Sequence, residues 1–154
     1  MTWPKGADMV TRLIVAGELE RITASDSQAR VMLADARRHL GSARAIAETD
    51  ALGAYVLTYD AARKAIAGIL EAQGLRATSR GGHVVLYDAA MAQFDPPLGS
   101  LIRPFNRMRA RRNQVEYASS ENPEVTSQEV LADLEKAAAL IDMAERVLPQ
   151  LDAF

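Results

Sequence analysis

The chain has 154 residues, 49% of them apolar and 25% charged, with no cysteine and a net charge of −2. This composition is that of a globular domain, and the lack of cysteine excludes disulfides, thiolate metal sites and cysteine nucleophiles. The charge balance excludes a strongly basic surface of the kind that coats nucleic acid, although a local basic patch remains compatible with it. Neither a membrane span nor a signal peptide is visible, so we expect one cytoplasmic domain over residues 1–154 with no membrane contact.

The first half of the chain is typical of helices. Alanine is abundant and aromatic residues make up only 5%, which favours helix over strand. Apolar residues recur at helical spacing in residues 7–22, and Ser25 with Gln28 forms a capping box that begins a helix over residues 26–39. Gly41 and Ser42 either interrupt this helix or only weaken it. Its predicted inward residues are Val31, Leu33 and Leu40.

The middle of the chain carries the longest periodic pattern, which predicts a helix over residues 50–73 with Gly74 at its C-terminal end. Residues 74–82 lack periodicity and predict a loop. A short helix over residues 83–92 follows, and Asp95-Pro96-Pro97 ends it. The predicted inward stripe of the long helix is Leu52, Val56, Tyr59, Ala62, Ile66 and Ile69.

The last third predicts two more helices. Ser100 caps the first, with Pro104 in its first turn, and this helix runs to about Tyr117 before residues 121–123 break it. Thr126 and Glu129 form a second capping box for a helix ending near Leu148. Five or six helices joined by short loops predict an all-α fold, an antiparallel helical bundle.

The most unusual feature is a run of five arginines, which are Arg103, Arg107, Arg109, Arg111 and Arg112. Three of them are spaced four residues apart, so they share one helix face and are predicted to contact successive phosphates of a nucleic acid. We therefore name Arg103, Arg107, Arg109 and Arg111 as candidate nucleic-acid-binding residues.

Arg112 falls on the apolar stripe of the same helix, where the spacing requires another apolar residue. Burying an unpaired charge costs several kcal/mol, so Arg112 is expected at a rim, a dimer interface or a binding site. The alternative is an ordinary pair with Glu116 one turn later, worth about 0.3–0.5 kcal/mol when exposed.

The stretch Arg109-Ala110-Arg111-Arg112-Asn113-Gln114-Val115-Glu116-Tyr117 resembles the motif helix of HEPN domains (higher eukaryotes and prokaryotes nucleotide-binding). In that motif an arginine and a polar residue precede a histidine by four to six residues. The upstream stretch AYVLTYDAARKAIAGILEAQGLR, followed by Gly82 and His83, is similar to the long helix and loop of small bacterial HEPN proteins.

The resemblance implies a HEPN-like bundle and metal-independent RNA cleavage at a homodimer interface, with Arg112, Asn113 and Tyr117 as the catalytic positions. Here Tyr117 stands where the family has histidine. Tyrosine titrates near pH ~10, so it moves protons poorly at neutral pH, which supports phosphate binding better than cleavage. Glu116 and His83 are accessory candidates.

The resulting hypothesis is an RNA- or nucleotide-binding protein of a toxin–antitoxin or defence module, with degenerate or weak ribonuclease chemistry and a cognate antitoxin as partner. The alternative is a non-catalytic dimeric partner or regulatory subunit, for instance of a nucleotidyltransferase. A weaker third interpretation is a helical scaffold with a solvated arginine face. No residues have metal-ligand spacing, so we expect neither a metal nor a cofactor.

Overall fold

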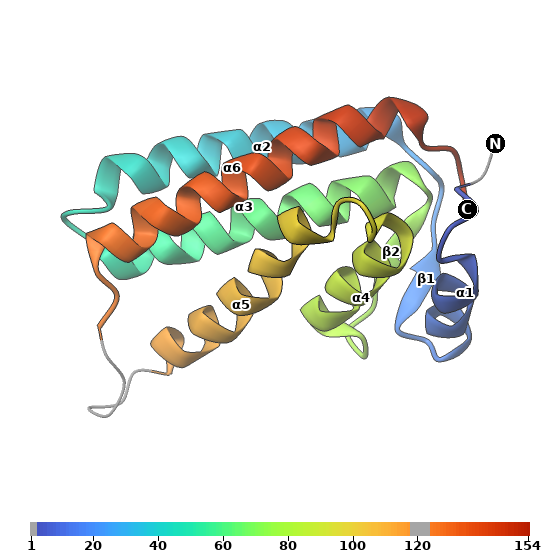
Figure 1. Cartoon of the computed structure of the whole chain (residues 1–154), viewed down its shortest axis with the longest axis horizontal. Coiled ribbons are helices and arrows are strands. Elements are labelled where there is room, and N and C mark those ends of the chain that lie inside the picture. The colour runs from blue at the N-terminus through green and yellow to red at the C-terminus, as the bar shows by residue number, and fades with distance from the viewer. Residues whose placement is uncertain (1–2, 118–123) are drawn as a thin grey trace.

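The computed structural model describes residues 3–117 and 124–154, which fold as an all-α bundle with one small sheet (Figure 1). The elements in chain order are α1 (Ala7–Val15), β1 (Leu19–Arg21), α2 (Asp26–Ile46), α3 (Ala51–Ala72), β2 (Leu75–Ala77), α4 (Gly82–Phe94), α5 (Gly99–Glu116) and α6 (Ser127–Val147), followed by a 3₁₀ turn at Leu148–Gln150. The predicted break at residues 121–123 lies outside the described residues.

Helix α3 is the centre of the bundle. Figure 1 shows α2, α3 and α6 side by side along the longest dimension, with α4 and α5 below α3 and α1 with β1 at the end where both termini lie. Helix α3 contacts α2, α6, α5, α4 and β2. It therefore carries buried residues around most of its circumference.

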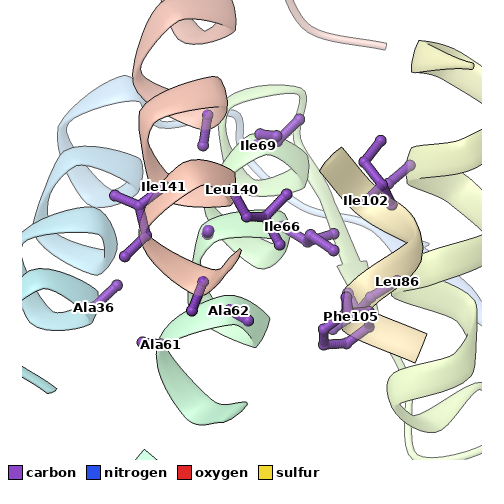
Figure 2. Close-up of a cluster of buried hydrophobic side chains, with 14 of the residues drawn as sticks. Ala36, Ala61, Ala62, Ile66, Ile69, Leu86, Ile102, Phe105, Leu140 and Ile141 are labelled. Carbon is purple, nitrogen blue, oxygen red and sulfur yellow. The ribbon is translucent and has the colours of Figure 1, made fainter. Parts of the chain in front are cut away.

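The core is built from small and branched side chains that several helices bring together. Figure 2 shows Ile66 and Ile69 of α3 between Leu140 of α6 and Ile102 of α5, all of which are buried. The apolar residues at helical spacing along α6 are all buried, and they are Val130, Leu134, Ala137, Ile141 and Ala144. Burial of such apolar surface is the main favourable contribution to folding.

The N-cap half of each predicted capping box is confirmed for α2 and α6, but the return bonds are not seen in the described part of the chain: the Ser25 N–H donates to the carbonyl of Glu71, and the Glu129 carboxylate accepts from Arg111. The Ser25 hydroxyl accepts from the backbone N–H of Gln28, and the Thr126 hydroxyl accepts from that of Glu129, both at 3.1 Å. Helix α2 runs through Gly41 without interruption. Helix α3 ends one residue before Gln73, and Gly74 has the predicted left-handed backbone, with φ of 75°.

The predictions missed the two strands. The helix predicted over residues 7–22 ends at Val15, and part of the loop predicted over residues 74–82 is β2. Strands β1 and β2 pair antiparallel, with Leu19 opposite Ala77. Each strand has three residues, too few to show an alternating pattern, and the pairing joins segments more than fifty positions apart.

The predicted start of α5 was also wrong. The helix begins at Gly99, so Ser100 lies inside it and caps nothing, and the N-cap residue Leu98 makes no side-chain cap. Pro104 lies in the helix interior rather than in its first turn. The helix therefore lacks the backbone hydrogen bond that residue 104 normally donates.

Two predicted core residues are exposed. Val31 is exposed because α2 turns Ala29 and Leu33 toward its neighbours, and a residue two positions from Ala29 points away from them. Leu52 lies in the first turn of α3, where it remains exposed. Tyr59, Ala62, Ile66 and Ile69 are buried as predicted, while Val56 is half-buried.

Candidate functional site

The three arginines on one face of α5 all form ion pairs with carboxylates. Each pair joins α5 to the segment that precedes it or to α6, at N–O distances between 2.5 and 3.1 Å. The pairs are Arg103 with Asp95, Arg107 with Asp133, and Arg111 with Glu129. A phosphate that approached this face would have to compete with these carboxylates.

The Arg107 pair belongs to a buried network. Asp133 is buried and accepts hydrogen bonds from both terminal nitrogens of Arg107 and, at 2.8 Å, from the hydroxyl of Tyr55. Burial by itself disfavours the charged carboxylate, but the hydrogen bonds from Arg107 and Tyr55 outweigh it and lower the pKa of Asp133. This network ties α3, α5 and α6 together.

Arg112 lies on the apolar stripe, as the sequence indicates. Its guanidinium carbon is 5.7 Å from the centre of the Tyr59 ring, and one terminal nitrogen pairs with Glu116 at 3.0 Å. Its Nε is buried and has no hydrogen-bond partner among the described residues. The pair with Glu116 therefore satisfies only part of this guanidinium, and a buried donor remains available.

Tyr59 connects Arg112 with His83. Its ring stacks on Phe105 with 5.6 Å between centroids, and its hydroxyl is 2.5 Å from Nδ1 of His83, the second residue of α4. Helices α3, α4 and α5 thus contribute polar side chains to the same place, and the guanidinium groups of Arg63 and Arg109 also act on His83. We refer to Tyr59, Arg63, His83, Arg109 and Arg112 as the Arg112 cluster.

The charges of the cluster keep His83 neutral. Burial lowers the pKa of His83, and the guanidinium groups of Arg63, Arg112 and Arg109 lower it further, while Asp60 acts in the opposite direction. Burial also raises the pKa of Tyr59 to about 12. At neutral pH the cluster therefore holds a neutral imidazole and a protonated phenol.

A neutral phenol and a neutral imidazole each carry one proton and one acceptor, so the direction of this hydrogen bond depends on the histidine tautomer. The Tyr59 hydroxyl has one proton, and the nearest acceptor is Nδ1 of His83. We assign the hydroxyl as donor, so the imidazole carries its own proton on Nε2. His83 then presents an N–H donor, which suits an anion and does not suit the abstraction of a proton.

Arg63 lies four residues after Tyr59 on α3 and donates through Nε and Nη2 to Asp60 at 2.9 and 2.7 Å. These bonds use two of its five N–H groups. Asp60 also lies 3.5 Å from both His39 and Lys64. The Asp60 charge is therefore shared among several cations, and the neighbourhood keeps an excess of positive charge.

The structure brings together only some of the predicted site residues. Arg112, Arg109 and His83 lie near one another, since both arginines act on the His83 charge. Asn113 is exposed, and Tyr117 is 80% exposed at the end of α5. No hydrogen bond found within the described ranges joins Asn113 or Tyr117 to the Arg112 cluster.

The sequence predicts Tyr59 as a core residue, and it is buried. Arg63, on the same helix, pairs with Asp60. The sequence did not indicate that these residues adjoin His83. A Tyr-x-x-x-Arg spacing on one helix face was the available signal.

Within residues 3–117 and 124–154 no group of three or more histidine or acidic side chains is arranged to hold a metal ion. No helix in the same ranges has the length and apolar character needed to cross a membrane.

Comparison with protein-family models, with curated proteins and with solved structures finds no match.

Proposed function

We propose that this protein binds the phosphodiester backbone of single-stranded RNA through the Arg112 cluster. The observation that carries the proposal is the buried Nε of Arg112, which lacks a partner beside the neutral imidazole of His83 and the guanidinium of Arg63. Guanidinium groups bind phosphate oxygens through paired N–H bonds, and the Arg112 side chain is 29% exposed, so a phosphate oxygen can reach its terminal nitrogens although the Nε itself is covered.

RNA binding rather than rapid cleavage fits the chemistry of the cluster. Cleavage through the ribose hydroxyl needs a base that accepts a proton near neutral pH. His83 carries its proton on the nitrogen that faces away from Tyr59, and Tyr117 is a phenol exposed at the end of α5. We therefore propose that any ribonuclease chemistry here is metal-independent and degenerate or weak.

The resemblance of residues 109–117 to the HEPN motif supports a biological setting for this activity. The proposal is a HEPN-like homodimer in a toxin–antitoxin or defence module, acting on RNA in the cytoplasm with a cognate antitoxin as partner. In a two-fold dimer the α5 helices of the two copies would meet, which would place two Arg112 clusters near each other.

A second candidate is a non-catalytic dimeric partner of a nucleotidyltransferase or another protein. The observation that favours it is that Arg103, Arg107 and Arg111 are already neutralised by carboxylates. An arginine face paired in this way contributes less to the salt-dependent attraction of a nucleic acid.

The test compares Arg112→Ala with the matched variant Arg44→Ala. Arg44 is an exposed arginine on α2 that pairs with Glu135, so both variants remove one positive charge. Loss of a charge-assisted hydrogen bond costs about 1.5–3 kcal/mol, so we expect Arg112→Ala to weaken RNA binding by about tenfold to a hundredfold. Fluorescence anisotropy of a labelled single-stranded RNA at low salt measures both affinities.

Equal affinities for the two variants, or no binding by the wild-type protein at low salt, would overturn the proposal. The same RNA, analysed on a gel in the presence of a chelator, reports cleavage. Tyr117→His restores the family histidine. A rise in cleavage by that variant would support a degenerate nuclease, whereas RNA binding without cleavage in both proteins would support binding alone.

A further inference from the structure

A cavity of about 400 Å³ opens beside the Arg112 cluster. It lies among α2, α3, β2 and α4, and Arg63 and His83 belong both to its lining and to the cluster. Ligand pockets in proteins usually measure about 300–1,000 Å³, so this cavity has room for a small organic group. The charged cluster and the cavity are thus two parts of one continuous region.

The chemistry of the lining changes along the cavity. Its apolar part consists of Met32, Ala67, Leu70, Leu75 and Leu86. Arg63, His83 and Gly82 lie at one end, where α4 begins, and the partial positive charge of a helix N-terminus adds to that of Arg63. Glu71 provides a carboxylate elsewhere in the lining.

We propose that this cavity holds the unstacked base of one nucleotide of the bound RNA, while Arg63 and His83 hold the adjacent phosphate. The inference rests on the proposed function and names what the site recognises. Proteins that read single-stranded RNA commonly take unstacked bases into pockets. An apolar cavity that ends in cationic donors matches a flat base joined to a phosphate.

The placement of Arg63 and Glu71 on α3 fits the length of such a ligand. They are eight residues apart, which is roughly 12 Å along a helix axis, a span suited to a phosphate at one end and the far edge of a base at the other. A carboxylate only accepts hydrogen bonds. Glu71 therefore disfavours uracil, whose single ring N–H lies between two carbonyl oxygens that repel a carboxylate, relative to adenine, guanine and cytosine, which present an exocyclic amino group.

The test fills the cavity without changing any charge. Ala67 lines the apolar part, so Ala67→Phe places a ring where the base would lie. Ala34→Phe is the matched control, because Ala34 is exposed on α2 and does not line the cavity. Circular dichroism and thermal melting establish that both variants fold. Met32→Phe, from the opposite wall, repeats the test if Ala67→Phe fails to fold.

The probe is a short single-stranded RNA that contains one 2-aminopurine, whose fluorescence rises when the base leaves the stack. We expect the wild-type protein and Ala34→Phe to raise this fluorescence and Ala67→Phe not to raise it. Anisotropy of the same RNA should show a tenfold or smaller loss of affinity in Ala67→Phe, because the phosphate contacts remain.

A companion RNA that lacks the base at one position separates this inference from the proposed function. If the wild-type protein binds the intact and the abasic RNA equally and Ala67→Phe changes nothing, the base pocket is wrong and backbone binding stands. If neither RNA binds at low salt, the proposed function fails. If RNA binds and the pocket holds a base, uracil at the probed position should bind several-fold more weakly, and Glu71→Gln should remove that preference.

Discussion

His83 is a residue whose charge depends on what is bound beside it. In the free protein, burial and the guanidinium groups of Arg63, Arg112 and Arg109 lower its pKa below the usual 6.5. A phosphate at the Arg112 cluster adds negative charge, which favours the protonated imidazole and raises the pKa. Binding should therefore be accompanied by the uptake of a proton.

This linkage predicts the pH dependence of RNA binding. Because the pKa of His83 is higher in the bound state than in the free state, affinity should increase as the pH falls from about 8 to about 6. His83→Gln cannot take up the proton, so its affinity should change little over the same range. Anisotropy titrations at several pH values check this, and a wild-type affinity that falls with decreasing pH would contradict it.

Asp133 carries a prediction about stability. Asp133→Asn keeps the shape of the side chain but removes the charge that faces Arg107, and its amide nitrogen meets donors from Arg107 and Tyr55. The variant should lose about 1–3 kcal/mol in the free energy of unfolding at neutral pH. Asp142→Asn is the control, since Asp142 is an exposed residue of α6 paired with Arg37, and it should lose less than about 0.5 kcal/mol.

The acid side of the same prediction follows from the lowered pKa of Asp133. A carboxylate whose pKa is lower in the folded state stabilises the protein above its unfolded pKa, and this stabilisation is lost as the pH falls through the folded value. Urea denaturation of the wild-type protein should therefore show a decline below about pH 4 that is smaller in Asp133→Asn. Equal slopes in the two proteins would show that the pKa of Asp133 is the same in the folded and the unfolded state.

The positions of some side chains of the candidate site could be predicted from the sequence, whereas the partners of others could not. The position of Arg112 on the apolar stripe could be predicted from helix periodicity alone, and its pair with Glu116 could be predicted from their spacing of four residues. The carboxylates facing Arg103, Arg107 and Arg111 could not, because Asp133 and Glu129 belong to another helix. Helix periodicity places a side chain on a face but does not say what lies opposite.

The start of α4 shows how closely two elements can approach. Gly81 precedes α4, and a Cβ atom added there would overlap the carbonyl oxygen of Glu18 and lie 2.8 Å from Cγ1 of Val85. Its backbone has ordinary right-handed helical angles. An alanine at this position would therefore clash with its neighbours but would not strain the backbone. The side-chain hydroxyl of Thr78 also bonds the carbonyls of Gly17 and Glu18, which fixes this approach.

Gly81→Ala is therefore expected to destabilise the protein by about 1–3 kcal/mol. Gly41→Ala is the opposite control, since Gly41 lies inside α2 with no atom within 4 Å of an added Cβ, and it should stabilise by about 0.5–1 kcal/mol. Thermal unfolding followed by circular dichroism measures both. If Gly81→Ala left the unfolding temperature unchanged, the segment at Glu18, directly before β1, would have to move away from α4 at little cost.

The elements that the sequence predicted best are those with local causes. Helices α3 and α6 have long periodic stripes and local caps, and both were placed to within two residues of their observed ends. The two strands were missed because neither has a pattern of its own and each needs the other, far along the chain, for its hydrogen bonds. The start of α5 was misplaced because Leu98 begins it without a side-chain cap.

For the whole molecule, the open prediction is self-association through α5. An arginine on an apolar stripe suits a two-fold interface, in which the same patch of each copy meets the other. Light scattering should therefore give twice the chain mass of 16.7 kDa at micromolar concentration. The mass of a single chain under these conditions would exclude the dimer.

A thiol scan locates the interface, because the chain has no cysteine of its own. Tyr117→Cys places a thiol on the exposed end of α5, and Val15→Cys places one on an equally exposed residue of α1. A short bismaleimide should link two copies of Tyr117→Cys and leave Val15→Cys unlinked. If two copies of Val15→Cys were cross-linked and two copies of Tyr117→Cys were not, the interface would lie at α1.

The all-α bundle itself was predictable from composition and periodicity, and the structure confirms it. The Arg112 cluster was predictable only in part, because it forms where α3, α4 and α5 meet. Which faces of three helices adjoin depends on how all of them pack, and a single sequence read locally does not contain that information.

The alanines of α3 have a consequence for the thermodynamics of binding. Buried alanine or glycine at 54, 61, 62, 65 and 68 lets the neighbouring helices approach closely, so α3 has little freedom to bend or shift. Tyr59 and Arg63 are mounted on this rigid helix. Their loss of conformational entropy therefore occurs during folding, so donors on this helix need little further ordering when a ligand binds. If the proposed RNA ligand binds here, most of the entropy lost on association is that of the flexible RNA strand.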